Sequence, residues 1–214
     1  MCFSPQADTV AGVVVGVIAV DAARHVRDRR DMALAAIPAV FAVHQFLEAG
    51  VWLWLRGSVS VSFGHSVLWA YLLVAFALPT LVPLAIWSIE PDQRRRRAMA
   101  TLLALGVAVS VWLVVAAVTG NVGAHIDGHH IVYTVGLSGA AVATGLYVVA
   151  TCGSLLLSSS PRLVLFGVGN LVAVALLVWL SAGGLFSLWC AWAAVTSACI
   201  ALHLRTDSRP LAAV

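Results

Sequence analysis

The feature that most constrains this chain is a series of long apolar segments, each close to the length that crosses a lipid bilayer. A spanning α-helix needs about 20 apolar residues. The chain is 62% hydrophobic and 10% charged, whereas soluble domains are roughly half apolar and a quarter charged. Seven segments have the required length, near residues 5–23, 33–55, 64–89, 98–119, 137–157, 162–182 and 185–204. We therefore predict an all-α integral membrane bundle of seven transmembrane helices.

The basic residues give this predicted bundle a direction. The sequence has no lysine, and all of its arginines except Arg56 fall on one side of the predicted membrane. Because cytoplasmic loops are enriched in basic residues, we predict a plasma-membrane protein with its N-terminus outside. A single domain would cover residues 1–204, and a cytoplasmic tail would cover 205–214. Asp21, near the inner end of the first span, is expected to pair with a loop arginine.

The second span carries an ionisable pair in an apolar surrounding. His44 and Glu48 in HQFLE are four residues apart, so they share one helix face about one turn apart. His44 is expected near the bilayer midplane and Glu48 closer to the outer face. A carboxylate at that depth costs about 2.5–3.5 kcal/mol on insertion scales unless it is protonated, paired or metal-bound. The pair therefore marks a candidate functional site, although a Glu–His hydrogen bond that only joins helices is the alternative.

Other polar residues are expected at a similar depth in the neighbouring spans. If their helix faces converge, they would form a polar centre around His44 and Glu48. Each one taken alone is more typical of a polar group satisfied by helix packing. These residues are Tyr71, Ser110, Tyr147, Asn170 and Cys190.

A second cluster of ligand-type residues lies in the outer loop before the fifth span. His125, Asp127, His129 and His130 fall within six residues of GNVGAHIDGHHIVY. Imidazole and carboxylate groups at such spacing suit zinc, copper or nickel. The alternative, which we favour, is a flexible polar loop, because the segment contains several glycines and no fixed ligand framework. Cys2 is expected on the same side of the membrane.

Several stretches together resemble one family of small bacterial multi-span membrane proteins, common in actinobacteria, that begin with Met-Cys-Phe-Ser. The matching stretches are MCFSPQAD, HQFLEAGVW, HHIVY, ATCGSLLLS, LWCAWAA and ALHLR. The resemblance touches most of the chain and implies a bacterial inner-membrane location, but it implies no particular activity. It directs attention to six residues: Cys2, His44, Glu48, Cys152, Cys190 and His203.

Two other seven-span families do not fit the residues. Microbial rhodopsins hold retinal on a lysine of the last span, and this chain has no lysine. The alkaline ceramidase and adiponectin-receptor superfamily uses an HxxxH pair there, whereas the last span here has only His203. No catalytic residue is transferred from either family, and no retinal is expected.

Three classes of function remain open at this point. The first is a metal site for zinc or copper that could support enzymatic chemistry, with ligands drawn from His44, Glu48, Cys190, Cys2, His125 and His129. The second is a haem-binding redox protein, which ranks lower because no second histidine lies at a matching depth. The third is a non-enzymatic sensor, proton or small-solute pathway, or accessory subunit.

The expected partners follow from the same residues. The lipid bilayer is the main one, together with a small apolar or lipid-like ligand and a second copy of the chain. Nucleic acid is not expected, because the net charge is only +3 and the basic residues lie in short loops.

Overall fold

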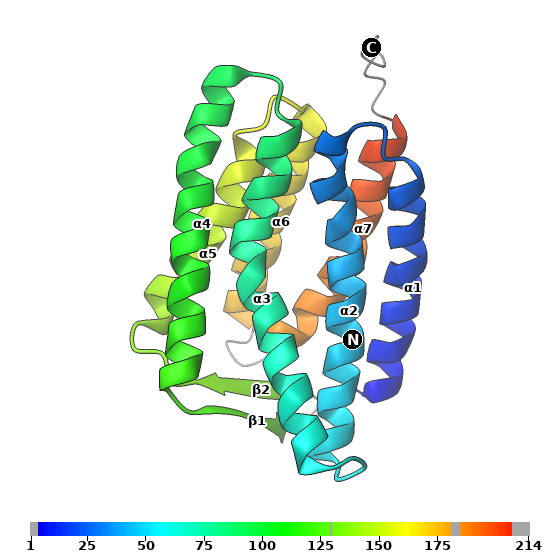
Figure 1. The fold of residues 1–214 in the computed structure, drawn as a ribbon, viewed down its shortest axis with the longest axis vertical. Helices are drawn as coiled ribbons and strands as arrows, with labels where there is room; N and C mark the ends of the chain where they lie inside the picture. Colours follow the sequence, from blue (N-terminus) through cyan, green and yellow to red (C-terminus); the bar gives the residue numbers. More distant parts are fainter. Residues whose placement is uncertain (1–3, 129, 181–184, 207–214) are drawn as a thin grey trace.

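A computed structural model describes residues 4–128, 130–180 and 185–206, apart from the side chains of residues 177–191. The described residues form a long bundle of seven α-helices with a β-hairpin at one end (Figure 1). The helices are α1 (Pro5–Arg24), α2 (Met32–Leu55), α3 (Val61–Ile89), α4 (Gln93–Thr119), α5 (Ala140–Leu156), α6 (Pro161–Leu180) and α7 (Leu185–Thr206). A single 3₁₀ turn, η1 (Arg29–Asp31), leads directly into α2.

The predicted segments are confirmed as helices. Four stretches of the described chain are long and apolar enough to cross a membrane: α1, η1 with α2, α3 and α4. Several boundaries differ from the sequence prediction by a few residues: α3 begins at Val61 rather than 64, and α5 begins at Ala140 rather than 137. Helix α7 runs to Thr206, two residues into the expected tail, and α4 begins at Gln93 rather than near 98.

The early start of α4 has a local cause. The Asp92 carboxylate accepts hydrogen bonds from the backbone N–H groups of Arg94 at 2.7 Å and Arg95 at 3.1 Å. These bonds cap the helix and lower the pKa of Asp92 below the ordinary aspartate value, Arg95 having the larger effect. Arginine is also a good helix former, so the arginine run forms the first turn of α4 instead of a loop.

Successive helices alternate in direction, so the connections divide between the two ends of the bundle. The α1–α2, α3–α4 and α5–α6 connections and the end of α7 lie at one end in Figure 1. These segments carry the arginines, and we call this the arginine-rich end. The α2–α3 turn, which begins with Arg56, and the β-hairpin lie at the other end, which we call the hairpin end.

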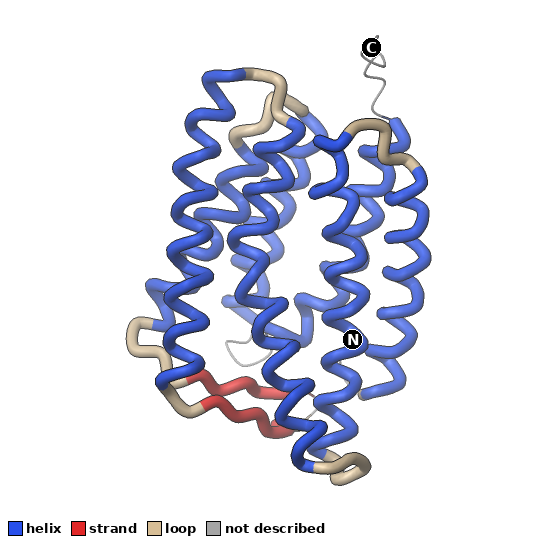
Figure 2. The backbone as a smooth tube through the Cα atoms, viewed as in Figure 1, coloured by secondary structure: helices blue, strands red, loops and turns tan. Residues whose placement is uncertain are grey.

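The hairpin corrects the all-α prediction. β1 (Val122–Asp127) pairs antiparallel with β2 (His130–Val135), as Figure 2 shows in red. The two strands are rich in β-branched residues, which favour extended structure, and Gly128 has the positive φ of +57° that a tight link needs. The expected flexible outer loop is therefore a paired element of fixed register.

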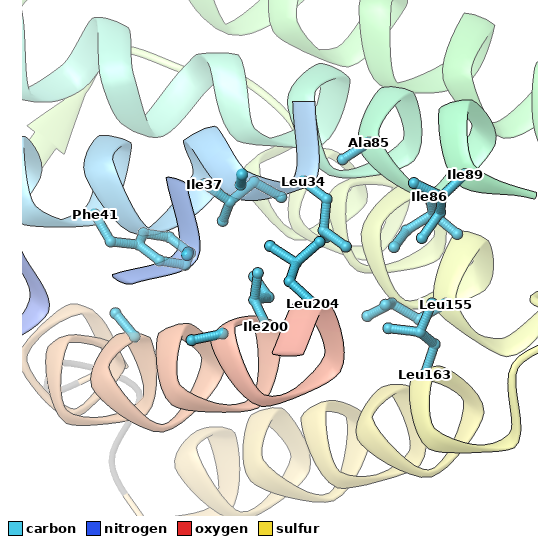
Figure 3. Packing of buried hydrophobic residues seen from close by; sticks show 14 of the residues in the cluster. Leu34, Ile37, Phe41, Ala85, Ile86, Ile89, Leu155, Leu163, Ile200 and Leu204 are labelled. Atoms are coloured by element: carbon cyan, nitrogen blue, oxygen red, sulfur yellow. The ribbon is translucent and has the colours of Figure 1, made fainter. Parts of the chain in front are cut away.

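The buried apolar side chains form two clusters, one toward each end of the bundle. The larger lies toward the arginine-rich end, where side chains of α2, α3, α5, α6 and α7 meet (Figure 3). The smaller joins α2 and α3 to α4 and β2 at the hairpin end. Its buried members are Val51, Trp52, Val67, Leu68, Tyr71, Leu72, Phe76, Ala117 and Ile131.

Polar side chains join the helices at the arginine-rich end. Asp21 accepts hydrogen bonds from Arg205 Nη2 at 2.6 Å and Nε at 2.8 Å, which ties α1 to α7. Asp21 therefore pairs with an arginine at the end of α7, whereas the sequence prediction was a loop arginine in general. Buried Glu90 accepts from the backbone N–H of Ser159 at 2.8 Å, which ties the α3–α4 connection to the α5–α6 connection.

The two prolines inside α3 create a close contact with its neighbours. Pro79 lacks the N–H that would bond the carbonyl of Ala75, and the Tyr147 hydroxyl donates to that carbonyl at 3.3 Å. Pro83 likewise leaves the Pro79 carbonyl without its intrahelical partner. Gly106 of α4 packs directly against that carbonyl: a Cβ at this position would lie 1.8 Å from the Pro79 oxygen.

This contact predicts a large effect of one methyl group. Gly106→Ala should lower the free energy of unfolding by about 1–3 kcal/mol, because backbone must move to admit the Cβ. Gly145→Ala is the matched control, because no atom lies within 4 Å of a Cβ there. That variant should gain up to about 1 kcal/mol of helix propensity. Reversible unfolding in detergent measures both, and equal stability of Gly106→Ala and the parent would contradict the packing.

Candidate functional site

The candidate site is a stripe of polar side chains on α2. His44, Glu48 and Trp52 follow one another at intervals of four residues, so they lie along one face of the helix. All three are buried, with His44 8% and Glu48 1% exposed. Gln45, also 1% exposed, lies beside them. Both residues of the pair that the sequence singled out are thus enclosed by the described part of the bundle.

An aromatic stack borders the histidine. The imidazole of His44 lies against the ring of Tyr71 on α3, with centroids 4.0 Å apart and an interplanar angle of 29°. Tyr71 in turn stacks on Tyr133 of β2, at 4.4 Å and 15°. Three rings from α2, α3 and the hairpin therefore form one column that fixes the position of the imidazole.

Two polar atoms of the stripe lie buried without a hydrogen bond. The His44 Nε2 atom and the Trp52 Nε1 atom have no partner among the described residues. A buried polar atom left unpaired costs about 1–3 kcal/mol. Native structures keep few such atoms, and a ligand or an ion is a common explanation.

Asp8 is a site residue that the sequence reasoning did not single out. It lies in the first turn of α1 and is completely buried. Gly12 packs against Phe46, and Gly16 faces Ala42. This antiparallel register places Asp8 level with Gly50 of α2, about half a turn from Glu48 along the axis.

Small residues make this approach of the helices possible. A Cβ on Gly12 would lie 3.0 Å from the Phe46 ring, and a Cβ on Gly50 would lie 2.9 Å from Val67 of α3. The glycines therefore allow α1 and α3 to pack closely on the two sides of α2. One feature of the sequence could have drawn attention to Asp8: it is an acidic residue in the first turn of α1, shortly after the cap Ser4.

The other predicted ligands are not brought together with His44 in the part of the chain that the structure describes. His125 is exposed on β1. Cys2 and His129 lie outside the described residues, and Cys190 lies in α7 with its side chain outside them. Among the described residues, no group of three or more histidine, cysteine, aspartate or glutamate side chains is placed to hold a metal ion.

Among the four expected mid-depth polar residues whose side chains the structure describes, Tyr71 alone lies against His44, and the side chain of Cys190 lies outside the described part. Ser110 of α4 bonds Thr80 of α3 at 2.8 Å, and Tyr147 bonds the Ala75 carbonyl. Asn170 of α6 accepts a hydrogen bond from the indole of Trp192. Each of these three residues therefore forms a hydrogen bond with a neighbouring helix, which was the alternative interpretation.

A separate internal cavity of about 50 Å³ lies between α2, α3, α5, α6 and α7. Its lining includes Tyr147, Cys152 and Asn170, but neither His44 nor Glu48. Cys152 is a free thiol and is buried. The cavity is large enough for a few water molecules and belongs to the packing of the bundle rather than to the α2 stripe.

The two remaining histidines of the arginine-rich end have different surroundings. His25 follows the last turn of α1, where its Nδ1 atom lies 2.8 Å from the Asp21 carbonyl oxygen. His203 of α7 is buried, at 7% exposure. Both lie at that end of the bundle, far along their helices from the α2 stripe.

Comparison with known proteins identifies the family of the chain. The model of a family of unknown function, DUF6629, matches residues 1–214, so the chain belongs to that family. No curated protein and no solved structure matches the chain. The match covers the whole chain, as the sequence resemblance covered most of it, and the family has no assigned function.

The aromatic column makes a prediction about the hairpin. Tyr133→Ala should loosen β1 and β2 from the bundle, because stacked rings contribute about 0.5–1.5 kcal/mol beyond their buried area. Amide hydrogen exchange over residues 122–135 should become roughly two- to tenfold faster. Tyr133→Phe keeps the stacked ring and should exchange more slowly than Tyr133→Ala. Unchanged exchange in the alanine variant would show that the stack does not hold the hairpin.

Proposed function

We propose that this protein is a seven-span plasma-membrane protein that binds a transition-metal ion, zinc or copper, at His44 and Glu48 in the outer half of the bundle. One observation carries the proposal: the buried Nε2 atom of His44 has no hydrogen-bond partner among the described residues. A neutral imidazole presents a lone pair at such an atom, and this lone pair is what a metal binds.

Glu48 supplies the second ligand of the proposed site. It lies one turn along α2 on the same face as His44, and it is completely enclosed. A metal ion would offset the charge of a carboxylate at this depth, which is otherwise costly in a membrane. Paired histidine and carboxylate ligands are typical of zinc, and imidazole also suits copper.

The aromatic column supports the same assignment. Tyr71 holds one face of the His44 ring, so the imidazole plane is set by packing and not by a hydrogen bond at Nε2. Ligand rings that are oriented in advance bind a metal with less loss of side-chain freedom. The candidates for its further ligands are Cys2, Cys190 and His129, which the sequence singled out and whose side chains lie outside the described part of the structure; the exposed His125 is the least suited.

The chemistry of the proposed site depends on its remaining positions. His44 and Glu48 would hold the metal, and, with one position open to water, the metal would supply the chemistry of a water molecule with a pKa near 7, which suits hydrolysis of an ester or amide. The site lies inside an apolar bundle, so a lipid-like substrate fits this chemistry. A metal with all positions filled by protein would serve a structural or sensing role instead.

A second candidate function is a proton pathway, and Asp8 favours it. Asp8 and Glu48 are both completely buried, and the helix register places them at nearly the same level. Buried carboxylates beside a histidine are the groups that membrane proton relays use. In this case the protein would hold no metal, and its behaviour would change with pH.

Metal analysis of the purified full-length protein tests the first candidate. The parent should contain about one zinc or copper ion per chain. His44→Ala and Glu48→Gln should each lose most of it, because each removes a ligand. An absorption spectrum of the same samples checks the haem alternative, since a Soret band would identify that group.

The matched control is His125→Ala, which removes an exposed histidine at the same end of the bundle. It should keep the metal. Thermal unfolding of each variant separates loss of metal from loss of fold. Equal metal content in the parent, His44→Ala and Glu48→Gln would refute the site, and a metal-free parent with pH-dependent stability would favour the proton pathway.

The proposed topology has its own test. Ser58, in the α2–α3 turn, and Ser159, in the α5–α6 connection, are both exposed and lie at opposite ends of the bundle. In a Cys2→Ser background, a membrane-impermeant maleimide should label Ser58→Cys in intact cells. It should label Ser159→Cys only after lysis. The reverse pattern, or labelling of both in intact cells, would contradict an external N-terminus and seven spans.

A further inference from the structure

A groove of about 630 Å³ runs between α1 and α7 toward the arginine-rich end. The two helices lie side by side in Figure 1. Ala198 and Ala201 of α7 face the groove, and their small side chains leave room between the helices. The volume falls within the range of about 300–1,000 Å³ that is usual for small-molecule sites.

The walls of the groove are apolar along most of its length. Val17 and Val20 of α1 and Leu202 of α7 line it, and they are 66%, 52% and 57% exposed. Such exposed side chains suit contact with a hydrocarbon chain and not with water. α1 is one of the four helices with the length and composition to cross a membrane, so this surface faces lipid in the proposed arrangement.

Charged groups gather at one end of the groove only. Arg24, Arg205 and Asp21 line it there, which leaves an excess of one positive charge. Arg205 uses its Nε and Nη2 atoms on Asp21, so its Nη1 group still has two N–H donors. Arg24 is exposed and makes no hydrogen bond or ion pair within 4.0 Å to the described residues.

We propose that this groove binds an anionic phospholipid. Its phosphate would lie between Arg24 and the Nη1 group of Arg205, and part of an acyl chain would lie along Val17, Val20 and Leu202. Basic pockets between spanning helices are known to recognise anionic headgroups at the cytoplasmic face. The occupant is a lipid and not a free anion, because the arginines lie at the end of an apolar groove that only a hydrocarbon chain would fill. This site is separate from His44 and Glu48 and does not depend on the proposed metal.

Native mass spectrometry of the full-length protein in neutral detergent tests this site. Phosphatidylglycerol and phosphatidylcholine with identical acyl chains are the two probes, and inorganic phosphate is the third. The parent should retain one phosphatidylglycerol with at least about fivefold preference over phosphatidylcholine, since each arginine near an anionic lipid contributes about that factor. Inorganic phosphate at the same concentration should not displace it.

Two variants separate the headgroup from the acyl chain. Arg24→Gln should weaken phosphatidylglycerol binding about fivefold. It should weaken phosphatidylcholine binding less, because the choline cation already offsets the attraction between the phosphate of that lipid and the arginine. Ala198→Leu should weaken both lipids, because the larger side chain fills the groove. Arg97→Gln is the matched control, since Arg97 is exposed at the same end in α4 and does not line the groove; it should bind like the parent.

Each contrary result overturns a stated part of the proposal. Equal retention of the two lipids would remove the headgroup assignment, and displacement by phosphate would replace the lipid with a simple anion. An equal loss in Arg24→Gln and Arg97→Gln would show general attraction to the arginine-rich end. If Ala198→Leu unfolds, judged by its melting temperature, Ala198→Val provides the same test with a smaller side chain.

Discussion

The structure depends on one constraint: a polar atom that is removed from water must find its partner inside the bundle. The prolines of α3 show how closely this rule is followed. Tyr147 donates to the Ala75 carbonyl that Pro79 leaves without its helical N–H. Nearby, Gly106 packs α4 closely against α3 at the Pro79 carbonyl. Thr80 and Ser110 bond each other across the same pair of helices.

Against this background, the α2 stripe differs from the acidic groups that join the helices at the arginine-rich end. Glu90 and Asp21, at the arginine-rich end, have bonded partners that join connections and helices. His44 is also buried, at 8% exposure, yet its Nε2 atom lacks a partner among the described residues. Its ring is nevertheless held by the stack on Tyr71. A fixed imidazole with a free lone pair is an arrangement suited to a ligand, and this contrast is the physical basis of the proposed metal site.

The sequence predicted the parts of this structure that depend on local patterns. Runs of about 20 apolar residues located all seven helices, and the i, i+4 spacing located the buried pair His44 and Glu48. Asp8 and Tyr133 could not be found in this way. Asp8 faces α2 because of the rotation of α1, which depth alone does not define. Tyr133 reaches Tyr71 only because the hairpin folds back on the bundle, a contact between residues 62 positions apart. The β-branched residues of β1 and β2 indicated extended structure, but the glycines and histidines of the same segment led to the prediction of a flexible polar loop.

The most direct test of the metal site is X-ray absorption at the zinc and copper edges on the purified protein. The proposed site predicts an absorption edge of about one zinc or copper ion per chain. It also predicts nitrogen and oxygen ligands near 2.0–2.2 Å, a sulfur at about 2.3 Å if Cys2 or Cys190 completes the shell, and the outer-shell scattering of an imidazole ring. That outer-shell signal should decrease in His44→Ala. Two results would show that His44 is not a metal ligand. One is the absence of a zinc or copper absorption edge from the purified parent, and the other is imidazole scattering of equal strength in the parent and in His44→Ala.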